Sequence, residues 1–197
     1  TATNSTGTSA ASSASNSVTP FAADGNYESI ATVTVGSGGT STISFTSIPQ
    51  TYTHLQLRYI ARNAYTGGPS YTNSDMYING DTTASHYTFH RLSSDGATAS
   101  ASAAANAGSI YVLATNANAS ANIFASGIVD ILDYANTNKY KTFRMLDGYD
   151  NNGSGFVDGL RSGTWLSTSA MTSFTITNPA STNWVQYSHF ALYGIKV

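Results

Sequence analysis

The stretch YESIATVTVGSGGTSTISF (Tyr27–Phe45) decides the fold class. Small and β-branched apolar residues alternate with threonine over residues 31–35, and Ile43 and Phe45 alternate with serine and threonine in the same way. Alternation with a period of two is typical of a strand with one buried and one exposed face. Between the two runs, the glycine-rich segment 36–39 predicts a hairpin turn.

Similar runs continue to the end of the chain, separated by turns rich in Asn, Gly and Ser. This pattern of short strands predicts an all-β domain, either a sandwich or a barrel. The last run, 187–197, has large apolar residues on both faces, so we expect it inside a sheet. The segment Ser93–Gly108 breaks the alternation and is expected to be a long loop that offers a contact surface. The other predicted strands are 55–61, 75–78, 85–92, 110–113, 123–134, 140–149, 156–166 and 173–177.

The chain divides into an arm over residues 1–26, rich in Ser, Thr and Ala, and a β domain over residues 27–197. The arm contains too little apolar surface to bury itself, which predicts a flexible extended segment. An alternative is that the arm becomes ordered on a neighbouring subunit. Val18, Pro20 and Phe21 would then be its anchor, because a segment held extended by proline loses little freedom when it binds.

Composition excludes several function classes. Only 9% of the residues are charged and the formal net charge is −2, so the chain has no basic field for nucleic acid. The absence of cysteine excludes disulfides and thiolate chemistry. No apolar run approaches the roughly 18 residues that span a bilayer, so no membrane association is expected.

One polar run has the spacing of a calcium loop. Asp150, Asn152, Ser154 and Asp158 occupy ligand-like positions, but Arg161 stands where such a loop needs a bidentate glutamate. The flanking segments also have strand patterns where a calcium loop has helices. A turn between two strands is therefore the favoured interpretation, with calcium as the alternative.

Histidine and aspartate pairs offer no better site. His86 and His90 are predicted on one face of a strand, about 13 Å apart, which is too far for a shared ion. Asp130 and Asp133 fall on opposite faces unless the strand ends or bulges between them. No catalytic motif is present, so we expect no enzyme, no cofactor and no metal.

Aromatic residues are the remaining candidates for binding. Tyr65 and Tyr71, in the loop NAYTGGPSYTN, could form a platform for a partner or a sugar ring. Trp165 and Trp184 are expected in the core, as most aromatic residues of a sandwich are.

Four strings carry a family resemblance: SIPQTYTHLQLRYIAR (Ser47–Arg62), YTFHRL (Tyr87–Leu92), DILDYANTNKYKTFRMLDGYDNNGSG (Asp130–Gly155) and ALYGIKV (Ala191–Val197). Together they resemble a group of small β-rich proteins common in tailed bacteriophages, especially those of marine and cyanobacterial hosts. The resemblance covers roughly residues 28–197 and leaves out the arm. Members with an assigned role are virion components with jelly-roll-like folds. The resemblance thus implies an antiparallel jelly-roll sandwich within a phage particle, and it carries over no catalytic residue.

The leading hypothesis is a capsid decoration or cement protein, a homo-oligomer and specifically a trimer, whose loops and arm bind phage capsid proteins on the outer shell of the virion. One alternative is a tail-fibre or spike module that binds host glycans, which would need an aromatic groove at the edge of the sandwich. The other is a secreted carbohydrate-binding or hydrolytic domain, which would need paired carboxylates in a cleft.

Overall fold

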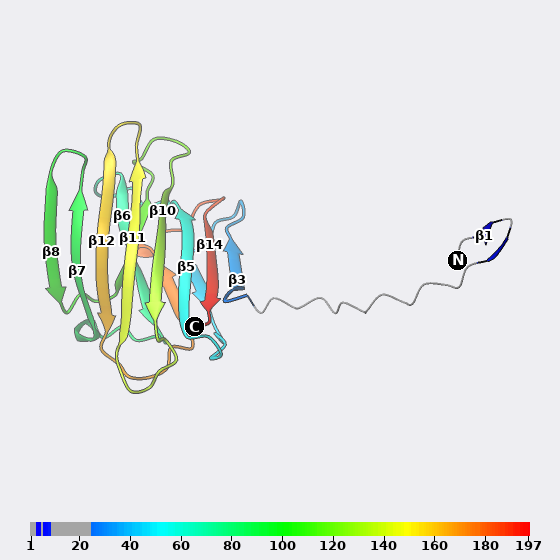
Figure 1. Cartoon of the computed structure of the whole chain (residues 1–197). Coiled ribbons are helices and arrows are strands. Elements are labelled where there is room, and N and C mark those ends of the chain that lie inside the picture. The colour runs from blue at the N-terminus through cyan, green and yellow to red at the C-terminus, as the bar shows by residue number, and fades with distance from the viewer. Residues whose placement is uncertain (1–2, 5, 9–24) are drawn as a thin grey trace.

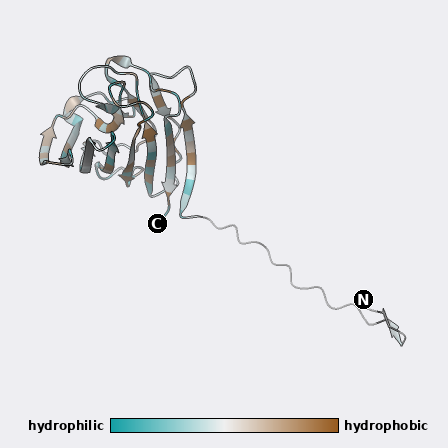
Figure 2. Ribbon diagram, turned by 90° about the horizontal axis from the view of Figure 1, so that it is seen from above, coloured by the Kyte–Doolittle hydropathy of each residue, from teal (hydrophilic) through white to brown (hydrophobic). Residues whose placement is uncertain are grey.

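Two antiparallel sheets face each other in the computed structural model of the chain, which describes residues 3–4, 6–8 and 25–197 (Figure 1). Viewed from above in Figure 2, the sheets form the two layers of a sandwich. The larger sheet has eight strands, in the spatial order β3 (Tyr27–Thr34), β14 (His189–Ile195), β5 (His54–Ala61), β10 (Ala125–Leu132), β11 (Lys141–Asp150), β12 (Gly155–Trp165), β7 (Tyr87–Ser94) and β8 (Ala99–Ala105). The smaller has four, in the order β4 (Thr42–Phe45), β13 (Phe174–Thr177), β6 (Tyr71–Ile78) and β9 (Ile110–Thr115). The expected β-sandwich is confirmed.

The strand order is that of a jelly roll. Strands β3, β14, β5 and β10 form one half of the motif, and β4, β13, β6 and β9 form the other. Successive strands of the motif lie in opposite layers, except β6 and β9, which are neighbours in the smaller sheet; this alternation is that of the two Greek keys of the fold.

The hairpin expected at residues 36–39 is wrong, because β3 and β4 lie in different sheets. The turn itself forms, with the Gly39 amide donating to the Gly36 carbonyl at 3.0 Å. A Cβ on Gly39 would lie only 2.8 Å from the backbone oxygen of Trp184, and Gly39 has a φ of +67°. The glycine thus lets the chain pass against the Trp184 segment into the other layer, where a hairpin would have kept it in one sheet.

Two hairpins are inserted into the jelly roll. One, β7–β8, lies between β6 and β9 in the sequence, and the other, β11–β12, lies between β10 and β13. They pair with each other through β12 and β7, and together they extend the larger sheet beyond β10 by four strands. In Figure 1 these strands form the left half of the sheet.

The long loop expected over residues 93–108 is wrong, because Ala99–Ala105 of this segment form strand β8. It pairs with β7 in a continuous register from Ser94 opposite Ala99 to Thr88 opposite Ala105. The Asp95 carboxylate closes the connecting turn, since its Oδ1 accepts from the amides of Ala97 at 2.9 Å and Thr98 at 2.7 Å. A run of Ala and Ser has no apolar alternation, so only the ladder with β7 makes it a strand.

The core lies between the two sheets and is closed by large side chains from both. Trp165 and Trp184 are buried, as expected. Strand β14 lies between β3 and β5, which confirms its predicted place inside a sheet. The remaining regular elements are the two-residue strands β1 (Thr3–Asn4) and β2 (Gly7–Thr8) and the 3-10 turns Ala84–His86 and Pro179–Ser181.

Candidate interaction surface

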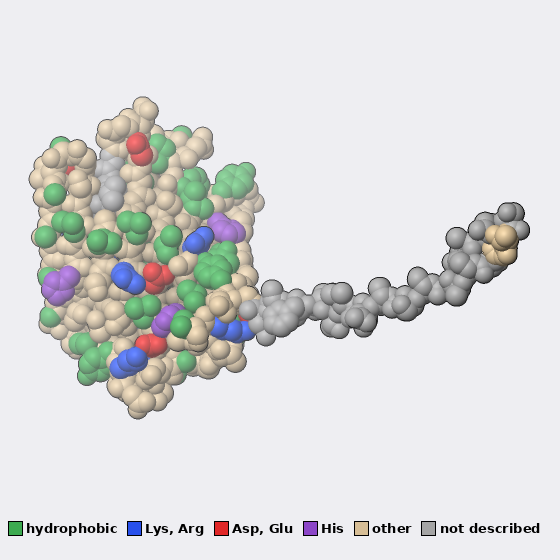
Figure 3. Space-filling view, in the orientation of Figure 1, with side chains coloured by type: hydrophobic (Ala, Val, Ile, Leu, Met, Phe, Trp, Pro, Cys, Tyr) green, Lys and Arg blue, Asp and Glu red, His purple; other side chains and the backbone are tan. Residues whose placement is uncertain are grey.

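Exposed leucines form a row across the outward face of the larger sheet. Leu160 of β12 stands opposite Leu92 of β7 on one side and Leu146 of β11 on the other. Their exposed fractions are 64%, 52% and 55%. The row continues to Ala101 on β8 and to Ile128 on β10. We call these five residues the apolar band. It crosses the face that Figure 3 presents as a line of hydrophobic side chains.

The inserted hairpins build most of this band. Its residues alternate along their strands with buried ones that face the core, such as Met145 and Arg161. The band is therefore the outer half of ordinary strand alternation, in which the outward positions would be polar if they met only water. A contiguous apolar patch on an outward face is typical of a surface that binds another macromolecule.

A polar row runs beside the band, one pleat further along the strands. It contains His90, Ser162, Arg144 and Asp130 on successive strands. Arg144 makes no hydrogen bond or ion pair with the rest of the described chain, whereas Asp130 accepts from Gln56 Nε2 at 2.8 Å. Between the band and this row lies a shallow hollow of about 650 Å³, lined by His90, Arg144 and the leucines of β7 and β12. The free guanidinium gives the hollow a positive side.

Aromatic and polar groups are connected at the other end of this face. Gln56 Oε1 accepts from the Tyr27 hydroxyl at 2.7 Å and from Arg58 Nε at 2.8 Å. Tyr27 stacks on Tyr193 with ring centroids 4.7 Å apart, and the Arg58 guanidinium lies 5.7 Å from the Tyr27 ring centroid. These contacts fix the side chains over β3, β14 and β5, so this half of the face is preorganised.

A second hollow, of about 750 Å³, lies nearer the β7–β8 and β11–β12 turns. Its lining includes Asp95 and Asp150 from the two turns, together with Tyr149 and Arg58. Hydroxyl, carboxylate and guanidinium groups beside aromatic rings are typical of polar ligand sites.

Beneath this hollow, the core contains a buried charged cluster. The Asp147 carboxylate accepts from the Tyr59 hydroxyl at 3.1 Å and from the Leu113 amide at 3.4 Å, both at Oδ2. Its other oxygen has no hydrogen-bond partner. Burial raises the pKa of Asp147, and the nearby Arg161 charge opposes that rise. Arg161 is itself buried and lies over the rings of Phe89 and Tyr111. No local sequence pattern indicates this cluster, because its members occupy core positions of the strand alternation.

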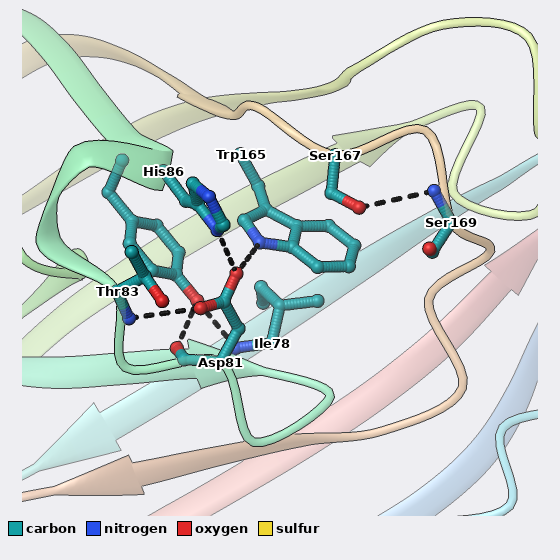
Figure 4. Close-up of polar contacts among 8 residues, drawn as sticks. Ile78, Asp81, Thr83, His86, Trp165, Ser167 and Ser169 are labelled. Carbon is teal, nitrogen blue, oxygen red and sulfur yellow. Dashed lines mark hydrogen bonds and ion pairs between the residues drawn. The ribbon is translucent and has the colours of Figure 1, made fainter.

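The Asp81 carboxylate organises a second polar cluster, drawn in Figure 4. Its Oδ2 accepts from His86 Nδ1 at 2.7 Å and from Trp165 Nε1 at 2.8 Å, and its Oδ1 accepts from the Thr83 amide at 2.9 Å. Burial raises the pKa of Asp81, but the hydrogen bonds from Trp165, His86 and Thr83 outweigh it and hold that pKa well below its usual range.

An aspartate bonded to a histidine is also part of hydrolytic triads, in which the histidine contacts a nucleophilic hydroxyl or thiol. The Ser167 hydroxyl accepts from the Ser169 amide at 3.2 Å, and Figure 4 places it beyond the Trp165 indole, away from His86. No hydrogen bond joins Ser167 to His86 in the described chain. The hydrogen bonds of the Asp81 cluster connect the segment between β6 and β7 to the end of β12.

Other histidines and aspartates are also placed differently from the sequence-based interpretation. His86 belongs to a 3-10 turn and not to the strand of His90, because β7 begins at Tyr87; the predicted shared face is wrong. Asp133 follows the end of β10 with a φ of +50°, accepts from Lys139 and lies 3.6 Å from His54 Nδ1. It therefore has partners of its own and does not pair with Asp130.

The run from Asp150 forms the turn between β11 and β12. Asp150 Oδ1 accepts from the Gly153 amide at 2.8 Å, and Asn152 and Gly153 both have positive φ. Ser154 Oγ donates to the Asn151 carbonyl at 3.1 Å. Within the ranges that the structure describes, no group of three His, Asp or Glu residues could hold a metal ion.

Tyr65 and Tyr71 are both half-buried, and each ring contacts neighbouring residues of this chain. The Tyr71 ring lies 6.0 Å from that of Tyr149, and a Cβ on Gly67 would collide with the Tyr65 ring. Asn116 Nδ2 fixes the loop by donating to the carbonyls of Pro69 and Tyr71. The anchor residues Val18, Pro20 and Phe21 lie outside the described residues.

No protein-family model matches this chain, and no curated protein or solved structure does either. Among the described residues, no helix has the length and apolar character needed to cross a membrane.

Proposed function

We propose that this protein is a non-enzymatic structural component of a phage virion, a decoration or cement protein that attaches to the outer capsid surface. The observation that carries the proposal is the apolar band, exposed on the outward face of the larger sheet and built mainly by strands that the jelly roll does not need. The sequence resemblance to virion proteins supplies the partner. The fold alone would not, since jelly rolls serve many functions.

The chemistry of the face suits permanent attachment. An apolar strip flanked by a few charged groups resembles the centre and rim of a protein interface. With so little charge on the chain, long-range steering is weak and attachment rests on apolar burial and hydrogen bonds repeated over many copies.

Binding of purified protein to particles that lack it tests the proposal. The double variant Leu146→Lys/Leu160→Lys places charge in the band, and Thr142→Lys/Thr164→Lys places the same charge on the same face of the same two strands, outside the band. We expect occupancy to fall at least tenfold for the first variant and to stay within about twofold for the second. Absence of the protein from purified particles, or equal occupancy for both variants, would refute the proposal.

The hollow lined by Asp95, Asp150, Tyr149 and Arg58 favours a second candidate function, binding of host glycans by a tail-fibre module. Screening the protein against host surface polysaccharides checks it. Saturable binding that is lost in Tyr149→Ala, together with labelling of tails and not capsids, would transfer the proposal to this function.

A further inference from the structure

The larger sheet ends in a strand edge that carries none of the usual protection. Strand β8 is seven residues long, is exposed along nearly its whole length and, among the described residues, pairs with β7 alone. Natural sheets protect such an edge with charges, proline, a bulge, a short strand or a covering segment. The sequence ASASAAA has no charge and no proline, and its register with β7 contains no shift.

The other three edges of the sandwich are protected. At the opposite end of the same sheet, β3 carries Glu28, which pairs with Lys196 at 2.7 Å, and its ladder with β14 has a register shift. In the smaller sheet, β4 has only four residues, and β9 is almost entirely buried. The bare edge of β8 is thus specific to the inserted hairpin.

We propose that β8 pairs with β8 of a second copy of this chain, so that two larger sheets join into one across a two-fold axis. A free strand edge binds an extended strand through backbone hydrogen bonds, and small side chains allow the close approach. The occupant must tolerate a neighbour with only Ala and Ser on both faces, and β8 itself meets this requirement without any charge conflict.

The side-chain pattern restricts the register. Antiparallel pairing must keep outward residues opposite outward residues, because side chains alternate between the two faces. Ala99, Ala101, Ala103 and Ala105 point outward with the band, while Ser100 and Ser102 point to the other face, where they bond to Ser93 and Arg91. Setting Ala101 opposite its own copy is one register that satisfies this rule, and it places each Ser100 opposite the Ser102 of the second copy.

This register also joins the two apolar bands end to end. Ala101 is the terminal residue of the band, so the two-fold axis would pass between the terminal residues of two bands and make one continuous strip. The continuity of the apolar strip favours a second copy of the chain as the occupant of this edge.

The contact is small, and this sets its strength. A strand of seven residues is about 23 Å long, so edge pairing buries less than the roughly 800 Å² per partner of a standard interface. We expect a reversible dimer whose population rises with protein concentration. All copies should be dimeric where many of them are bound side by side on one surface. A trimer would need a head-to-tail contact instead. The inference does not depend on which partner the band binds.

Sedimentation over a hundredfold range of concentration tests the dimer with the full chain. Ala101→Lys puts two ammonium groups opposite each other at the axis and should raise the dissociation constant at least tenfold. Thr32→Lys, the same change on the exposed edge strand β3, should leave it within twofold. A monomer or trimer at every concentration, or a dimer that survives Ala101→Lys, would overturn the inference.

Disulfide trapping tests the register separately, because the chain has no cysteine of its own. Opposed residues in an antiparallel pair have Cα atoms about 4.5–5.5 Å apart, within the range that a disulfide spans. Ala101→Cys should therefore form a covalent dimer readily under mild oxidation, and Ala99→Cys, on the same face of the same strand, should do so at least tenfold more slowly. Equal rates of disulfide formation for the two variants would refute this register. In a separate test, loss of the dimer on deleting residues 1–24 would assign the β8 edge to the arm.

Discussion

Replacing Asp81 with alanine should destabilise the sandwich by about 2–4 kcal/mol. The largest contribution comes from Trp165, whose side chain is only 3% exposed and whose indole N–H would lose its acceptor. A buried donor left without a partner costs about 1–3 kcal/mol. His86 and the Thr83 amide are more exposed and can turn to water, so together they add about 1 kcal/mol.

The loss should depend on pH in a definite direction. Because the pKa of Asp81 is lower in the folded chain than in the unfolded one, its contribution is present above the ordinary carboxyl pKa, near 3.9, and is lost as the pH falls through the folded value. The difference in stability between wild type and Asp81→Ala should therefore shrink as the pH falls below about 4.

Urea unfolding followed by circular dichroism measures the free energy of unfolding and its dependence on pH. In thermal unfolding at neutral pH, the melting temperature of Asp81→Ala should fall by roughly 4–16 °C. Asp95→Ala is the matched control, since that carboxylate also accepts two backbone amides but lies in an exposed turn. We expect a much smaller loss for the control. A loss below about 0.5 kcal/mol for Asp81→Ala, or a difference that grows in acid, would refute the reasoning.

Two further substitutions test buried polar groups. Tyr59→Phe removes a hydrogen-bond donor to Asp147 and should cost about 1–3 kcal/mol of unfolding free energy. Because burial raises the pKa of Asp147 in the folded chain, the free energy of unfolding falls as the pH rises through that folded pKa. Urea unfolding at a series of pH values should show a steeper fall of this free energy for Tyr59→Phe than for the control Tyr65→Phe. Lys141→Met removes three hydrogen bonds from the buried ammonium to loop carbonyls and should cost about 2–4 kcal/mol in thermal unfolding. Lys139→Met, which breaks only an exposed ion pair, should cost less than about 1 kcal/mol, and equal losses for the two lysines would contradict the assignment.

Strand alternation predicted the fold class and most of the strands. A period of two reports which side of a strand is buried, and this is a local property that survives in any sandwich. It does not report which strands are neighbours, so the local pattern at 36–39 predicts a hairpin although the chain changes sheets there. The reason is an approach between Gly39 and Trp184, two residues distant in the sequence, which no local pattern contains.

The candidate surface was harder to predict. Leu92, Leu146 and Leu160 are separated in the sequence, and each alone is an unremarkable exposed leucine. Only the registers of β7, β11 and β12 align them in one row. Strand β8 was missed for a different reason: its ordering comes from the ladder with β7 and not from burial of its own side chains. One signal was available, namely a run of Ala and Ser without glycine, proline or charge, which is a poor loop composition.

The inserted hairpins carry the functional argument because the jelly roll is complete without them. Their inner residues, such as Phe143 and Met145, add to the core, and that gain would be the same with threonine at every outward position. Outward leucines in register and an unprotected strand edge lower solubility without adding to the core, so folding alone does not account for them. A partner that covers both features does, and the edge and the band meet at Ala101. A second copy at the edge and a capsid surface against the band would cover different sides of that residue, so the two proposed contacts are compatible in one assembly.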